Sequence, residues 1–180
     1  MKKELFQEIE IPEGVEAEIE GNSLKIKGPE GEVERRFDID NLVFEKKENK
    51  ILIGNKKSTR REKKLMNTLT AHISNLIEGV QKKFEYKLKI CYSHFPFTVE
   101  IKDREVIIKN FLGEKVPRKV NLPKGVEAEV DKEYITIKSA NKESAGQAAA
   151  NLERATKIRG RDIRVFQDGI YIVNKAGKDI

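Results

Sequence analysis

The feature that most restricts the fold is a run of alternating apolar and polar residues followed by one helical pattern, and this order occurs twice. The alternation begins in residues 15–19 and 24–26, on either side of a Gly-Asn-Ser turn, and it continues to residue 53. Such alternation is typical of strands with one buried face. A helical stripe follows, and both patterns return after Phe84. The order predicts an α+β fold of two similar domains from an internal duplication, each a mainly antiparallel sheet with one helix packed on a face.

Two offsets could relate the halves. The longer offset aligns the segment 12–18 with the segment 123–129, which it closely matches. The shorter offset aligns the strand patterns 18–19 with 100–101 and 51–53 with 135–137, and it makes both helix starts coincide. The longer offset would set the first helix against the segment from Ile170 onward, where no helical pattern exists. We therefore expect the shorter repeat, with an N-terminal domain of acidic strands and a basic helix start over residues 1–82, and a C-terminal domain over residues 83–180.

The helix ends carry capping residues. Thr59 with Glu62 three residues later forms a capping box, so we expect the first helix to start near Thr59, and Gly79 marks its predicted end. Asn141 is the predicted N-cap of a second helix over residues 142–158, and Gly160 is its predicted C′ residue.

The last apolar stretch, residues 165–172, contains Asp168-Gly169 between apolar runs. Asp-Gly is a common two-residue hairpin turn. The sequence therefore predicts one final hairpin there.

Composition excludes several classes of protein. The longest uncharged run, residues 65–77, is thirteen residues long and polar in part, whereas a membrane span needs about 20 apolar residues. The first eight residues hold no apolar core of a secretion signal. A single cysteine, Cys91, allows no internal disulfide and no multi-cysteine metal site. We expect no metal, no cofactor and a reducing, cytoplasmic setting.

The net charge of +6 is unevenly distributed, from −5 over residues 1–50 to +6 over residues 51–83. Residues 55–64 hold six cations and one acid at the predicted start of the first helix. A helix N-terminus disfavours cations and attracts anions, so fold stability gives no reason for this cluster, whereas phosphate binding does. A solvated basic loop is the alternative. The candidate RNA-binding residues here are Lys56, Lys57, Arg60, Arg61, Lys63 and Lys64.

A second cationic group follows the second helix. The helix dipole alone would favour the cations at its end, but those around Gly160 lie on irregular chain that can follow a phosphate backbone. Phe166 and Tyr171 lie nearby and could stack on an exposed base, although we expect both rings in the core. The candidate RNA-binding residues here are Arg154, Lys157, Arg159, Arg161, Arg164 and Lys175.

Signals for catalysis are weak. Cys91 and His94 stand three residues apart, but no glycine-flanked nucleophile and no third catalytic member accompany them. His72 falls within the first helical stripe, where a core or boundary role is commoner than ligation. The chain has no glycine-rich nucleotide-binding motif. We therefore expect a protein that is not an enzyme.

Three segments resemble the sixth large-subunit ribosomal protein family in its archaeal and eukaryotic branch. They are Leu-Thr-Ala-His-Ile-Ser-Asn-Leu-Ile-Glu-Gly-Val at 69–80, Tyr-Ser-His-Phe-Pro at 92–96, and Arg-Gly-Arg-Asp-Ile-Arg-Val-Phe-Gln-Asp-Gly-Ile-Tyr at 159–171. The resemblance covers nearly the whole chain. It implies a structural protein of the large ribosomal subunit that binds large-subunit ribosomal RNA mainly through its C-terminal domain. It also implies a position near the sarcin–ricin loop and the docking region of translational GTPases.

Applied to this chain, the resemblance implies an RNA-contacting loop that contains Lys157, Arg159, Arg161 and Arg164. It implies a lesser RNA role for the acidic first domain. Expected partners are large-subunit ribosomal RNA and neighbouring ribosomal proteins, with no membrane and no small-molecule substrate, for a monomer within the ribosome. Two alternatives stay open: a two-domain protein-binding adaptor that uses exposed sheet edges, and a small hydrolase built on Cys91 and His94.

Overall fold

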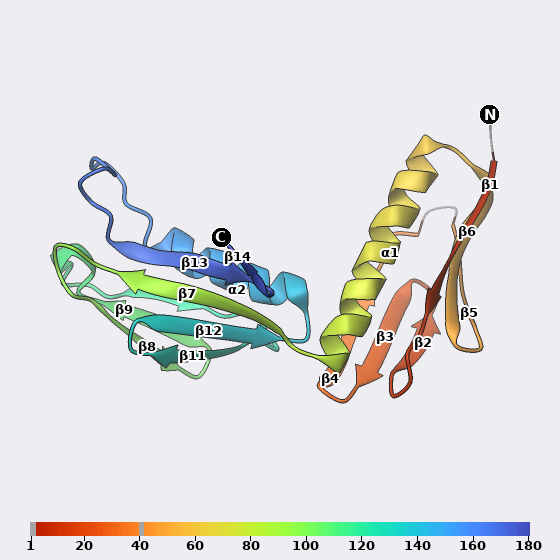
Figure 1. Cartoon of the computed structure of the whole chain (residues 1–180), viewed down its shortest axis with the longest axis horizontal. Coiled ribbons are helices and arrows are strands. Elements are labelled where there is room, and N and C mark those ends of the chain that lie inside the picture. The colour runs from red at the N-terminus through yellow and green to blue at the C-terminus, as the bar shows by residue number, and fades with distance from the viewer. Residues whose placement is uncertain (1–2, 40–41) are drawn as a thin grey trace. The chain divides into compact units, whose positions relative to one another are not determined.

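The computed structural model describes residues 3–39 and 42–180, and the chain divides into two compact units, residues 1–83 and 84–180 (Figure 1). Each unit combines antiparallel strand pairs with one α-helix over its described residues. The predicted α+β fold class is therefore confirmed.

The first unit places α1 against two small sheets. Its elements are β1 (Lys3–Glu10), β2 (Glu16–Glu20), β3 (Ser23–Gly28), β4 (Gly31–Arg36), β5 (Val43–Lys47), β6 (Lys50–Ser58) and α1 (Arg60–Gln81). The sheet orders are β1-β6-β5 and β2-β3-β4. α1 packs against strands of both sheets, and Ile51, Ile53, Ile73 and Val80 are fully buried between them.

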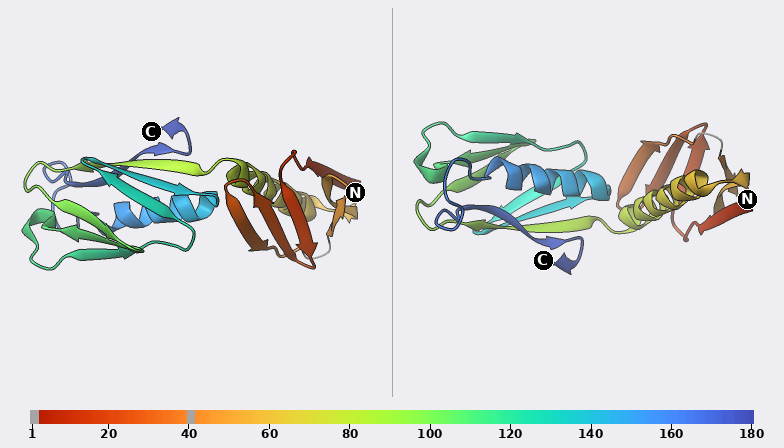
Figure 2. Two further views of the ribbon diagram at one scale, coloured as in Figure 1. Left: turned by 90° about the horizontal axis from the view of Figure 1, so that it is seen from below. Right: turned by 90° about the horizontal axis from the view of Figure 1, so that it is seen from above.

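The second unit repeats this plan and adds a strand pair. Its elements are β7 (Phe84–Cys91), β8 (Thr98–Lys102), β9 (Glu105–Lys109), the 3-10 turn η1 (Phe111–Gly113), β10 (Arg118–Asn121), β11 (Glu127–Asp131), β12 (Tyr134–Ser139), α2 (Lys142–Ala155), β13 (Gly169–Lys175) and β14 (Lys178–Asp179). The sheet orders are β11-β12-β7-β13-β14 and β10-β9-β8. Figure 2 shows α2 lying along one face of the larger sheet, and Ala145, Ala148, Ala149 and Leu152 of this helix are fully buried.

The duplication follows the shorter repeat. The sheet β1-β6-β5 corresponds to β7-β12-β11, and β2-β3-β4 corresponds to β8-β9-β10. The hairpin β2–β3 begins at Glu16 and its counterpart β8–β9 at Thr98, and the same offset separates the first helical residues, Arg60 and Lys142. The pair β13–β14 has no counterpart in the described part of the first unit.

The start of α1 is as predicted, but its end is not. Thr59 is the N-cap and forms the capping box with Glu62. Gly79 was expected to end the helix, yet it is buried inside it, and the helix continues to Gln81. The extra turn is fixed by tertiary contacts, because the Val80 side chain is fully buried and the Val80 carbonyl accepts the N–H of Glu30 at 2.9 Å.

Two expectations near the C-terminus were wrong, and some strands were not predicted. Asn141 caps α2 as predicted, but the helix ends at Ala155, so Gly160 is not its C′ residue. Asp168-Gly169 is not a hairpin turn, because Asp168 is buried and Gly169 begins β13; the final hairpin turns at Ala176-Gly177 instead. The strands β1, β10 and β14 were not predicted.

Candidate RNA-binding surface

The cationic residues predicted around Gly160 lie on one long loop of the second unit. This C-terminal loop, residues 156–168, connects α2 to β13 and extends past the end of the sheet (Figure 1). Strand pairing resumes only after the loop, where Gly169 lies opposite Cys91. The loop is therefore held by side chains and turns and not by a strand ladder.

The loop starts at a buried hydroxyl. Thr156 is 2% exposed, and its Oγ1 accepts the N–H of Ile170 at 2.9 Å while lying 3.4 Å from the carbonyl of Leu152. The guanidinium of Arg118 donates to the Ala155 carbonyl at 2.6 Å and so satisfies a free end of α2. The helix was predicted to extend to residue 158 but ends at Ala155. It ends three residues early because Thr156 is hydrogen-bonded to Ile170 at the start of β13.

A tight turn forms the tip of the loop. The Asp162 carboxylate accepts the N–H of Arg164 at 2.9 Å, and the Asp162 carbonyl accepts the N–H of Phe166 at 2.9 Å. Gly160 adopts φ +68°, a left-handed conformation that glycine enters without steric cost. The backbone here folds on itself, which leaves the side chains of Arg159, Arg161 and Arg164 exposed to solvent.

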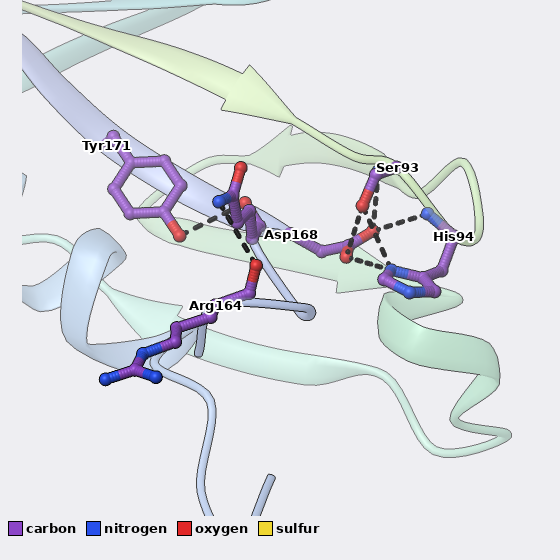
Figure 3. Close-up of polar contacts among 6 residues, drawn as sticks. Ser93, His94, Arg164, Asp168 and Tyr171 are labelled. Carbon is purple, nitrogen blue, oxygen red and sulfur yellow. Dashed lines mark hydrogen bonds and ion pairs between the residues drawn. The ribbon is translucent and has the colours of Figure 1, made fainter. Parts of the chain in front are cut away.

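The loop ends at a buried carboxylate. Asp168 is 1% exposed, and one of its oxygens accepts the backbone N–H groups of Ser93 at 2.9 Å and His94 at 3.0 Å (Figure 3). The other oxygen lies 2.6 Å from His94 Nδ1 and 3.2 Å from Ser93 Oγ. Burial alone would raise the pKa of Asp168, but the hydrogen bonds from His94 and Ser93 outweigh it and hold the pKa well below its usual range. Asp168 therefore clamps the loop to the segment between β7 and β8.

Ser93, His94 and Asp168 have the composition of a catalytic triad but not its geometry. A triad histidine uses one ring nitrogen for the carboxylate and the other for the nucleophile. Here Ser93 Oγ, at 3.0 Å, and Asp168 face the same atom, His94 Nδ1. Because both groups meet the same ring nitrogen, the histidine cannot pass a proton between them.

Aromatic stacking extends the clamp into the loop. The His94 ring stacks on Phe166 with centroids 4.4 Å apart and planes 17° apart. The guanidinium carbon of Arg161 lies 4.8 Å from the centroid of the same Phe166 ring, a cation–π distance. Phe166 was expected in the core and is half-buried, and the alternative of stacking on a base is disfavoured because His94 and Arg161 already contact this ring.

The cations of the loop are exposed and have no ion-pair partner. Within residues 3–39 and 42–180, none of the five loop and helix-end candidates forms an ion pair: Arg154, Lys157, Arg159, Arg161 and Arg164. An open concavity of about 870 Å³ is lined by Arg154, Lys157 and Arg159 together with Glu153 and several apolar side chains. The same three cations line a second concavity of about 410 Å³, together with Arg161 and with the paired Arg118 and Glu114. Four cations, Arg154, Lys157, Arg159 and Arg161, thus surround the two concavities, and Arg164 is exposed elsewhere on the loop.

Two candidates behave differently from the loop. Lys175 is exposed at the far end of β13, so the length of the strand, roughly 20 Å at about 3.3 Å per residue, separates it from the loop. Tyr171 was expected in the core, but it is 42% exposed, because alternation along β13 buries Ile170 and turns the next side chain outward. Its hydroxyl donates to the Gln167 carbonyl at 3.1 Å (Figure 3).

The first unit carries the other predicted basic cluster at the end of β6 and the start of α1. All six residues are exposed: Lys56, Lys57, Arg60, Arg61, Lys63 and Lys64. The helix N-terminus itself is not an open anion site, because the Glu62 carboxylate accepts the Thr59 N–H at 2.8 Å and also contacts the Thr59 hydroxyl. That contact with the Thr59 hydroxyl and the backbone N–H bonds lower the pKa of Glu62. Phosphate contact here would depend on side chains.

Sequence reasoning missed Arg118, His94 and Asp168 as loop-ordering residues. Arg118 makes a two-pronged ion pair with Glu114, including a 2.8 Å bond from Nε, and its guanidinium lies 4.4 Å from the Phe111 ring centroid. No sequence pattern marked this residue. His94 and Asp168 do lie in two of the segments that carried the family resemblance, and that was the available signal.

The described residues contain no group of three or more His, Cys, Asp or Glu placed to hold a metal ion. No helix within that same part of the chain is long and apolar enough to cross a bilayer. The described part of the chain thus combines a duplicated α+β fold, an exposed cationic loop and a Ser-His-Asp cluster that lacks the geometry of a catalytic triad.

Comparison with known proteins gives the family. The family described as ribosomal protein L6 matches residues 11–83 and 95–169, one segment in each unit. The chain is similar to large ribosomal subunit protein uL6 of Methanothrix thermoacetophila, with 42% identity over 97% of this chain and 99% of the relative. It is also similar to uL6 of Methanobrevibacter smithii (46% identity, 94% and 95% covered) and of Sulfurisphaera tokodaii (45%, 95% and 92%). The chain therefore belongs to the ribosomal protein L6 family, a family of structural proteins and not of enzymes, as its resemblance implied.

Proposed function

We propose that this protein is a structural component of the large ribosomal subunit and binds large-subunit ribosomal RNA through its C-terminal loop. The observation that supports this most directly is the group of five exposed cations on the loop and at the end of α2, none of which forms an ion pair with a carboxylate of the described chain. Unneutralised cations on ordered chain attract phosphates and release counterions when they bind. Membership of the family supports the ribosomal assignment.

Further parts of the proposal rest on the family more than on geometry. The protein acts in the cytoplasm as a single copy in the ribosome, near the docking region of translational GTPases, and neighbouring ribosomal proteins contact it. The cluster over residues 56–64 contributes a weaker RNA contact, because its helix N-terminus is occupied by Glu62. Lys175 contributes least, since it lies away from the loop.

The salt dependence of binding tests the loop. Arg159→Gln with Arg164→Gln removes two charges and leaves the Arg161–Phe166 contact intact. Each neutralised phosphate contributes roughly 0.7–0.9 to the slope of log K against log salt, so we expect the slope for a large-subunit RNA fragment to flatten by about 1.4–1.8. The measurement is filter binding at several salt concentrations.

A matched control keeps the same charge change away from the loop. The control is Lys124→Gln with Lys178→Gln, at the opposite end of the second unit's larger sheet. The loop meets the Cys91 end of β7, whereas Ser139, which bonds to Gly125, pairs with the other end of β7, and Lys178 lies opposite Lys175 at that same end. We expect this control to change the slope by less than about half as much. Equal slopes for both double variants would show that the loop is not the contact.

A further inference from the structure

The outer edge of β1 is unpaired, whereas the equivalent edge in the second unit is filled. β1 pairs with β6 on one side, and no strand of residues 3–39 and 42–180 pairs with its other side. The equivalent strand β7 pairs with β12 on one side and with β13 on the other. The duplication therefore leaves the first unit one strand short, because the chain after α1 continues directly into β7.

An equivalent hydrogen bond in each unit shows which residues of β1 correspond to which residues of β7. Ile11 donates its N–H to the Asn49 carbonyl at 2.8 Å, and Ile90 makes the same bond to Glu133 at 2.7 Å. Backbone groups alternate along an antiparallel strand, so residues one and three before each isoleucine direct their N–H and C=O away from the paired strand. In β1 these are Glu8 and Glu10.

In β7 the corresponding residues are Lys87 and Lys89. Both lie opposite residues of β13, Lys89 opposite Tyr171 and Lys87 opposite Asn174. The backbone groups of Glu8 and Glu10 are thus placed to pair with an added strand as those of Lys87 and Lys89 do.

The charge of the edge is inverted between the units. Where β7 has Lys87 and Lys89, β1 has two glutamates, and both lie near a single lysine, Lys50, at 3.0 and 3.6 Å. Their side chains remain 57% and 82% exposed. An open groove of about 450 Å³ lies between this end of β1 and α1, with Ile9 and Ile77 among its apolar residues and Glu13 and Glu78 among its acids.

We propose that the free edge of β1 binds an extended, basic segment of a partner protein, which adds to the sheet as β13 adds to β7. Strand addition satisfies the outward backbone groups, and alternate side chains supply specificity. β13 shows the pattern required, since Ile170 and Ile172 pack in the core beside α2 while Tyr171 points outward. The partner segment alternates apolar residues, which enter the groove, with Lys or Arg beside Glu8 and Glu10.

Ribosomal RNA is disfavoured on this edge, because the acids of β1 and of the groove repel phosphate. The site is thus separate from the cationic loop, and its failure would not affect the RNA-binding proposal. An edge strand left unpaired is also prone to unwanted association, which natural proteins usually block with charge. The acids of β1 repel an acidic strand and attract a basic one.

The test uses the full chain and a synthetic heptapeptide, Lys-Val-Arg-Ile-Lys-Val-Lys, with Glu-Val-Asp-Ile-Glu-Val-Glu as the acidic counterpart. We expect saturation with the basic peptide to slow amide hydrogen exchange of Glu8 and Glu10 by at least about tenfold, since each amide gains a bond. The acidic peptide should leave both exchange rates unchanged. Unchanged exchange with the basic peptide, or protection of these amides by a ribosomal RNA fragment instead, would overturn the proposal.

Two variants and a control locate the binding. Glu8→Pro removes an N–H that faces the partner and keeps the bonds from β1 to β6, and we expect it to abolish peptide binding. Glu8→Lys with Glu10→Lys preserves the backbone and should weaken binding by at least about tenfold. Glu45→Lys on β5, the opposite edge of the same sheet, should change binding by less than about twofold. Equal weakening by the β1 and β5 charge variants would show non-specific attraction and refute the edge site.

Discussion

Asp168→Ala is expected to destabilise the second unit by about 3 kcal/mol. The substitution removes the acceptor of two backbone N–H groups and two side-chain groups on Ser93 and His94. Leaving buried donors unsatisfied costs roughly 1–3 kcal/mol each, although part of this is recovered by water at the half-exposed His94. Urea unfolding followed by tyrosine fluorescence measures the effect on the second unit, because all four tyrosines lie there.

The pH dependence of this effect has a defined sign. The pKa of Asp168 is lower in the folded protein than its unfolded value of about 3.9, so its stabilisation is fully present above about pH 4. It is lost as the pH falls below that value toward the folded pKa. The stability difference between the wild type and Asp168→Asn should therefore shrink on acidification below about pH 4.

Asp162→Ala is the matched control in the same loop. Asp162 is exposed, and its carboxylate accepts one local bond, from the Arg164 N–H. We expect a change in unfolding free energy below about 1 kcal/mol. If the two alanine variants were equally stable, Asp168 would not be the clamp of the loop.

Asp168→Ala also distinguishes the effect of loop order on RNA binding from the effect of charge. If Coulomb attraction alone determined the affinity, removing an acid from a basic surface would strengthen RNA binding. Asp168 instead holds His94, on which Phe166 and then Arg161 stack. Loosening this stack adds an ordering cost to binding. We therefore expect Asp168→Ala to weaken binding of a ribosomal RNA fragment by roughly tenfold, and tighter binding would argue against a preordered loop.

Much of the fold follows from local patterns in the sequence. The hairpin β2–β3 and the start of α1 are determined by residues within a few positions of each other: a Gly-Asn turn and the Thr59–Glu62 capping box. The features that were not predicted depend on distant residues. Gly79 stays helical because β3 and the following turn, which are remote from it along the chain, pack on Val80.

The same distinction applies to the candidate site. The cationic character of the loop is visible in the sequence, because Arg159, Arg161 and Arg164 are close neighbours around Gly160. What orders the loop is not visible, since Asp168 bonds to Ser93 and His94, which belong to a distant part of the sequence. A local rule assigns Asp-Gly to a hairpin turn, and a buried long-range bond overrides it.

Gly28→Ala is expected to destabilise the first unit by about 2–3 kcal/mol. An added Cβ would lie 2.7 Å from the Val80 carbonyl oxygen and 2.9 Å from the Val80 Cβ and Cγ2 atoms. Neither can move freely, because Val80 is fully buried and its carbonyl also accepts the Glu30 N–H. Overpacking of this kind typically costs about 1–3 kcal/mol, and the rigid neighbour puts this case in the upper part of that range.

The sign of this effect identifies its cause. Replacing glycine by alanine usually stabilises a protein by roughly 0.4–1 kcal/mol through the unfolded state, when the native backbone tolerates it. Amide hydrogen exchange of Ile51 and Ile53, both fully buried in β6, measures the change within the first unit. Lys27→Ala on the same strand is the control and should cost less than about 0.5 kcal/mol, since its ion pair with Glu32 is long and exposed. Slower exchange in Gly28→Ala would mean that the substitution stabilises the first unit. In that case β3 would not pack tightly against the last turn of α1, and a different contact would hold that turn in the helix.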